Sequence, residues 1–196
     1  MHEKANMNQA YNQIIDDLIK FHEIKQLLPE TLYLAVSIFR RFLSVKQVTD
    51  YDELLHIGVT AMFIASKYEE SESQEEKEEP INIADFCGIA NRKFLKKEIV
   101  QKELDILDIV QFDLHYFNPV HFLERLLKEA NADKKTCKLS YYLMKISLVD
   151  HQLALVCSSY LADTAFYFAH QILDNSWVCY HVSRDLWVNN ANFDRI

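Results

Sequence analysis

The chain has 196 residues, 49% of them hydrophobic and 26% charged, so it can bury a core in one domain or in two small ones. Its net charge of −8 disfavours sequence-independent binding to nucleic acid or to an anionic membrane, since both depend on clustered Lys and Arg. Two glycines and three prolines supply few of the turns that hairpins need. We therefore expect an all-α fold whose partner is a protein.

Helical periodicity divides the first half of the chain into five segments. An apolar stripe over residues 11–21 predicts the first helix. A second helix is predicted over 29–43, because the missing N–H of proline does no harm at a helix start. Later helices are predicted over Leu54–Ala65, Ile83–Ala90 and Phe94–Val110.

The segment Leu54–Ala65 is apolar almost all round, which is typical of a helix surrounded by others. Asp50 or Asp52 is expected to cap its start. The helix runs into the polar sequence Lys-Tyr-Glu-Glu at 67–70, and the acidic stretch at 71–80 follows. We expect the acidic stretch to be a surface loop, either solvated or in contact with basic residues of a partner.

The sequence after Pro119 again consists of apolar segments with helical periodicity. Its predicted helices are Val120–Glu129, Leu139–Val149, Leu153–Ile172 and Trp177–Trp187. The long third segment is rich in small residues, which let helices approach closely. Residue identity between the halves is low, so the repeat is suggested by architecture alone.

No catalytic, cofactor or metal signature is present in the sequence. The eight histidines form no H-E-x-x-H motif and no zinc-type spacing, and a glycine-rich phosphate loop is absent. The four cysteines are widely spaced and read as thiols of a reducing compartment. With no signal segment and no apolar run of membrane-spanning length, we expect a non-enzymatic intracellular protein of the nucleus or cytoplasm, without cofactor or metal.

Charges at the ends or edges of apolar helices form the one informative constellation: Lys67, Glu69, Glu70 and Glu103. Covered by a second protein, such charges need partners, because a desolvated unpaired charge is costly. Charges of this kind would make an interface specific for one partner. The alternative is that they pair with each other on the surface for about 0 to 1 kcal/mol.

Three runs resemble the cyclin box in order and spacing, most closely that of the A/B type: ETLYLAVSIFRRFLS (30–44), VTAMFIASKYEE (59–70) and KKEIVQKELDILDIVQFDLHYFNPVHFLERLL (96–127). The resemblance implies a cyclin fold of two tandem five-helix bundles. It places an N-terminal cyclin box at 10–117 and a C-terminal repeat, incomplete at its end, at 118–196.

The resemblance also implies a regulatory subunit that binds and activates a cyclin-dependent Ser/Thr kinase in cell-cycle control. Cyclins grip the mobile helix C of the kinase with a Lys and a Glu, which fall here on Lys67 and Glu103. The other positions that match the kinase-facing surface of the family are Tyr68, Glu69, Glu70, Leu107, Phe112 and Leu114.

The first helix departs from the family pattern M-R-x-x-L-V-D-W. Gln13 and Asp17 stand in it, so the apolar groove that docks R-x-L peptides is not expected here. The acidic partner of the missing Arg is also replaced, by Arg40, which could pair with Asp16 or Asp17. His56 replaces a usual Leu, either as a core histidine or as a sign of looser packing. Besides a kinase activator, a sequestering cyclin-like protein and a non-kinase scaffold of the same fold remain open.

Overall fold

The computed structural model describes residues 2–70, 82–89, 94–150, 153 and 156–174. These residues form helices and their connections, with no strand among them. The predicted acidic loop at 71–80, the predicted helix Trp177–Trp187 and Cys179 lie outside the described residues.

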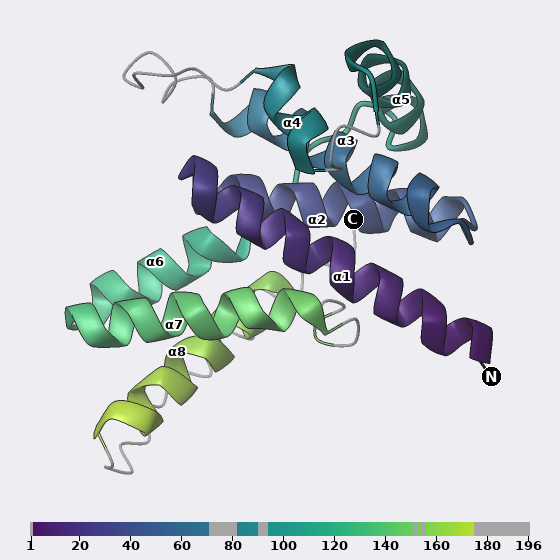
Figure 1. The fold of residues 1–196 in the computed structure, drawn as a ribbon. Coiled ribbons are helices and arrows are strands. Elements are labelled where there is room, and N and C mark those ends of the chain that lie inside the picture. The colour runs from purple at the N-terminus through teal and green to yellow at the C-terminus, as the bar shows by residue number, and fades with distance from the viewer. Residues whose placement is uncertain (1, 71–81, 90–93, 151–152, 154–155, 175–196) are drawn as a thin grey trace.

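Eight α-helices and a short 3-10 helix make up this part of the chain (Figure 1). They are α1 (His2–Lys25), α2 (Pro29–Val45), α3 (Tyr51–Glu69), α4 (Ile83–Ile89), α5 (Lys96–Ile109), α6 (Pro119–Glu129), α7 (Lys134–Ile146), η2 (Ser147–Val149) and α8 (Ser158–Asp174).

Helix α3 is the hub of the first group of helices, as its all-round apolar sequence predicts. It contacts α1, α2, α4 and α5, and most of its residues from Leu54 to Ser66 are buried. Asp50 caps its start: the Asp50 carboxylate accepts a hydrogen bond from the Glu53 N–H at 2.9 Å. Burial of aliphatic and aromatic side chains around α3 supplies the main driving force for folding of this half.

Gly58 lets α1 approach α3 closely. A Cβ atom at this position would lie 2.7 Å from Cγ2 of the buried Ile14 side chain. Only a residue without a Cβ fits this contact unless one helix shifts. Gly58 therefore sets the spacing between the first helix and the hub.

Two helices of the second half begin at positions other than those predicted. Helix α7 begins five residues before Leu139, because the Asp133 carboxylate accepts a hydrogen bond from the Thr136 N–H at 2.8 Å and caps the helix. Its apolar periodicity becomes regular only later, so the pattern alone misses the first turn. Helix α8 begins at Ser158, after the predicted start at Leu153.

Helix α1 lies between α2–α5 and the group formed by α6, α7 and α8 (Figure 1). Lys145 of α7 forms an ion pair with Glu23 of α1 at 2.9 Å. At the start of α6, the Asn118 amide donates a hydrogen bond to the Glu30 carbonyl oxygen at 3.0 Å, while its own oxygen accepts from the Val120 N–H and caps the helix. These contacts fix the second group of helices against the first.

Candidate protein-binding site

The end of α3 and the middle of α5 bring Lys67 and Glu103 together. The Lys67 ammonium lies 2.6 Å from the Glu103 carboxylate, and it also lies 4.9 Å from the centre of the Phe63 ring. The Lys67 side chain is 54% exposed and that of Glu103 only 10%. The two side chains thus form the mutual pair that the sequence left open, and they present mainly an ammonium group to solvent.

A second ion pair fixes α5 across α3. Lys102, next to Glu103 in the chain, lies 2.8 Å from the Glu53 carboxylate in the first turn of α3. Adjacent residues of α5 therefore reach opposite ends of α3, and the buried side chains of Ile99 and Ile106 lie on the packed face of α5. This arrangement holds the Lys67–Glu103 pair on a rigid base.

Glu70 lies in the interior, unlike its neighbours in the Lys-Tyr-Glu-Glu sequence. It is 0% exposed, and its carboxylate accepts hydrogen bonds from the Leu28 N–H at 2.6 Å and from the Thr31 hydroxyl at 2.7 Å. Leu28 offers no side-chain cap to α2, so Glu70 supplies the negative group that the helix N-terminus favours. Its position corrects the expectation of a surface contact: Glu70 positions α2 against the end of α3.

The apolar residues predicted for the site differ in exposure. Tyr68 is 53% exposed and Phe112 is 64% exposed, whereas Leu107 and Leu114 are partly buried against the core. Phe112 is presented by a tight turn after α5 in which Gln111 and Phe112 have φ values of 56° and 55°. Non-glycine residues seldom adopt this left-handed conformation, so the turn needs support from its surroundings.

Arg41 provides that support. Its guanidinium donates to the carbonyl oxygens of Asp113 at 2.6 Å and Val110 at 3.2 Å. It thereby satisfies backbone acceptors at the end of α5 and fixes the turn that exposes Phe112. Arg41 was not predicted as a site residue, although two consecutive arginines on an otherwise apolar helix are a signal that the sequence contains.

Comparison with known proteins agrees with this architecture. The model of the cyclin N-terminal domain matches residues 1–115, and that of the cyclin C-terminal domain matches residues 117–186. The chain belongs to the cyclin family. Both the predicted family and the predicted all-α cyclin fold are thus confirmed.

Relatives of this cyclin-family chain include G2/mitotic-specific cyclins. It is 44% identical over 161 residues to cyclin-B of Emericella nidulans, covering 82% of this chain and 32% of that protein. The chain is also 38% identical over 160 residues to cyclin cdc13 of Schizosaccharomyces pombe, and the match covers 82% of this chain and 32% of that protein. The chain thus spans about a third of the length of these relatives.

Two solved structures share the fold. A viral cyclin from herpesvirus saimiri superposes with a TM-score of 0.74 at 18% identity, covering 94% of this chain and 82% of the viral chain. A chain of the yeast RNA Pol II CTD kinase CTDK-1 complex superposes with a TM-score of 0.67 at 20% identity, with coverage of 97% and 65%. Both likenesses concern the fold.

Glu69 is the remaining predicted site residue. It is partly buried. Burial raises the pKa of its carboxyl, the neighbouring Glu30 carboxylate raises it further, and the His121 imidazole partly offsets both effects. No local sequence pattern indicated that the charges of Glu30 and His121 would act on Glu69.

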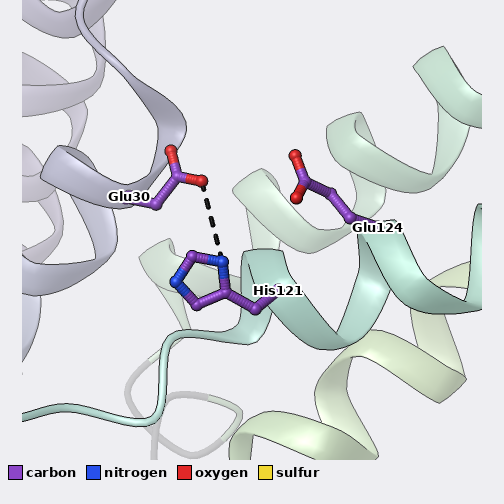
Figure 2. A group of neighbouring side chains, drawn as sticks. All are labelled: Glu30, His121 and Glu124. Carbon is purple, nitrogen blue, oxygen red and sulfur yellow. Dashed lines mark ion pairs between the residues drawn. The ribbon is translucent and has the colours of Figure 1, made fainter.

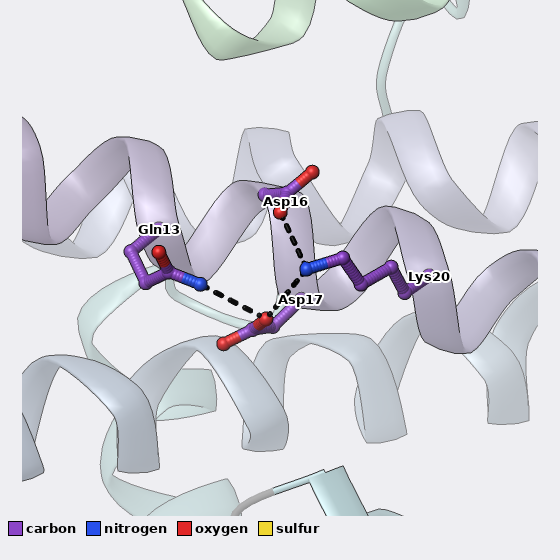
Figure 3. A network of polar contacts seen from close by, with 4 residues as sticks. All are labelled: Gln13, Asp16, Asp17 and Lys20. Atoms are coloured by element: carbon purple, nitrogen blue, oxygen red, sulfur yellow. Dashed lines mark hydrogen bonds and ion pairs between the residues drawn. The ribbon is translucent and has the colours of Figure 1, made fainter.

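Four polar residues of α1 form a network of contacts (Figure 3). Lys20 lies 2.6 Å from the Asp16 carboxylate and 3.4 Å from that of Asp17, while the Gln13 amide donates to Asp17 at 3.2 Å. Asp16 and Asp17 therefore both pair with Lys20. The absence of R-x-L docking stays a prediction.

His56 is a partly buried histidine at the edge of the core. Its ring stacks on that of Phe94 with centroids 4.3 Å apart. Burial lowers the pKa of the imidazole, and the nearby Lys102 ammonium lowers it further. This supports the first of the two readings of His56, that of a core histidine.

Among the described residues, no helix combines the length and hydropathy that a membrane span requires.

Proposed function

We propose that this chain is the regulatory subunit of a cyclin-dependent Ser/Thr kinase, active in cell-cycle control in the nucleus or cytoplasm. The observation that carries the proposal is the exposed Lys67 ammonium braced on Glu103, with the exposed Tyr68 ring next to it in the chain. Similarity to G2/mitotic-specific cyclins supports the same assignment. Residues 10–117 form the kinase-binding repeat in this proposal.

Activation works by selecting one conformation of the kinase. An active kinase needs its β3 Lys paired with the Glu of helix C. A rigid partner that binds helix C only in its inward position shifts the population of the kinase toward the active state. The chain supplies no catalytic atom in this scheme, so it is not itself an enzyme.

The Lys67–Glu103 pair suits the task because Lys67 is already compensated. An ammonium group has three N–H donors, and the contact with Glu103 at 2.6 Å occupies one of them. The others are available to carbonyl oxygens of a partner. Since Glu103 stays beside Lys67 in the complex, the charge is not left unpaired when the partner excludes water.

Aromatic side chains supply the apolar part of the interface. Tyr68 and Phe112 are both more than half exposed, and Leu107 and Leu114 are partly exposed. Exposed aromatic anchors commonly carry much of the affinity at a protein interface. Arg41 maintains the turn that carries Phe112, so it contributes to binding indirectly.

A pull-down of the purified chain with cyclin-dependent kinases, followed by a histone phosphorylation assay, tests the proposal. We expect kinase binding and increased phosphorylation with the wild type, and loss of both with the Lys67→Ala/Glu103→Ala double variant. Lys20→Ala on the outer face of α1 is the matched control and should retain both. Binding without activity would indicate a sequestering subunit, and no binding would favour a non-kinase scaffold.

A further inference from the structure

A histidine and two glutamates converge where the two groups of helices meet (Figure 2). Glu30 lies in the first turn of α2, whereas His121 and Glu124 lie on α6. The His121 Nδ1 atom is 3.9 Å from a Glu30 carboxylate oxygen. One ligand atom from each residue lies within 4.8 Å of the other two.

The donor set matches a borderline divalent metal ion. One imidazole nitrogen and two carboxylate oxygens are usual ligands of Zn²⁺, at about 2.0 to 2.2 Å from the ion. Ligand atoms around a tetrahedral ion are then about 3.4 Å apart. The side chain of His121 is 67% exposed and Glu124 is exposed, so small rotations of these two can close the gap to that spacing.

The backbone already holds the ligands in place. The Asn118 amide donates to the Glu30 carbonyl oxygen at 3.0 Å and so fixes the start of α6 beside the start of α2. His121 and Glu124 are three residues apart on α6, which puts both on one face of that helix. The Tyr141 hydroxyl donates to a Glu124 oxygen at 3.3 Å and orients that carboxylate from outside the cluster.

The local charge also favours a cation. The carboxylates of Glu30 and Glu124 lie beside the single imidazole of His121. Among the described residues, the ion pair of Glu30 is with His121. A bound dication would offset the repulsion between the two carboxylates.

We propose that Glu30, His121 and Glu124 form a Zn²⁺-type binding site that joins the first repeat to the second. A water molecule completes the tetrahedron around the ion. Because its ligands come from α2 and α6, the bound ion clamps the two repeats together. Mg²⁺ and Ca²⁺ bind poorly at this site, because both ions prefer six or more oxygen ligands and the site offers a nitrogen and few oxygens.

Metal titration of the full chain tests this site without any kinase. The chain is first treated with EDTA, and Zn²⁺ is then added while binding heat and thermal unfolding are followed. We expect one Zn²⁺ per chain at this site. When the free Zn²⁺ concentration is about a hundred times the Kd, Tm should rise by about 5 °C. Mg²⁺ at the same concentration should leave Tm unchanged.

Matched variants separate this site from other histidines. His121→Ala and Glu124→Gln each remove an exposed ligand and should abolish the Zn²⁺-dependent rise in Tm. His115→Ala, an exposed histidine outside the cluster, and Glu129→Gln, an exposed glutamate further along α6, should retain it. The proposal is overturned if Zn²⁺ produces no shift in the wild type, or if the shift survives unchanged in His121→Ala.

Discussion

Charged residues at the C-terminus of α3 differ in their surroundings between its inner and its outer side. On the inner side, Glu70 is fully buried and accepts two hydrogen bonds from the start of α2. On the outer side, Lys67 is half exposed and pairs with Glu103. Lys67 and Glu70 therefore differ both in exposure and in the groups they contact.

The difference teaches that burial decides what a charge does at a helix end. A buried carboxylate whose hydrogen bonds are satisfied holds the fold together, because its loss strands the donors it served. An exposed ion pair contributes little stability, so it is free to serve recognition. Substitutions on the two sides should accordingly separate stability from binding.

Glu70→Ala should have the largest effect on stability. It leaves the Leu28 N–H and the Thr31 hydroxyl without their buried acceptor, which should cost about 3 kcal/mol of unfolding free energy. Urea denaturation measures the loss. Thr31→Val removes only one of the donors and should cost about 1 kcal/mol. A loss below that of Thr31→Val in the Glu70 variant would contradict the inner role.

Gly58→Ala tests the packing that carries both sides of α3. The added methyl would lie 2.7 Å from Ile14 Cγ2, and the resulting overpacking should cost about 2 kcal/mol despite the better helix propensity of Ala. Gly88→Ala in α4 is the matched control. It meets no atom within 4 Å and should gain up to about 1 kcal/mol. Thermal unfolding of both variants at one pH compares them.

Glu69→Gln should have a small effect of the opposite sign. Burial and the Glu30 carboxylate raise the pKa of Glu69, so the folded state favours the protonated form. The wild type thus loses stability as pH rises through this pKa, whereas the Gln variant does not. We expect a gain of less than about 1 kcal/mol at pH 7, since water screens this side chain, and no gain at acid pH. Unfolding curves recorded between pH 4 and 8 decide the sign.

Features of the fold that depend on local sequence patterns could be predicted from the sequence. The all-round apolar run of α3, its Asp50 cap and the proline start of α2 predict helices that the structure contains. Lys67 and Glu103, 36 positions apart, were assigned to one site from the resemblance to cyclins. Only the structure shows that their side chains are in contact, at 2.6 Å. Periodicity cannot reveal which distant side chains meet.

The missed features all depend on contacts between distant segments. Glu70 turns inward because Leu28 and Thr31, about forty positions earlier, supply donors there. Arg41 reaches the turn at Asp113 across 72 positions, and Glu30 of α2 lies near His121 of α6. A helix-end charge looks the same in the sequence whether it faces the core or solvent, so only the packed structure distinguishes these roles.

Reversal of the exposed ion pair tests the central claim most directly. The Lys67→Glu/Glu103→Lys double variant keeps opposite charges at the two positions but presents a carboxylate in place of the ammonium. We expect its unfolding free energy to stay within about 1 kcal/mol of the wild type, while the Kd for the cyclin-dependent kinase measured by titration calorimetry rises tenfold or more. An unchanged Kd in a folded variant would contradict the claim that this pair grips the kinase.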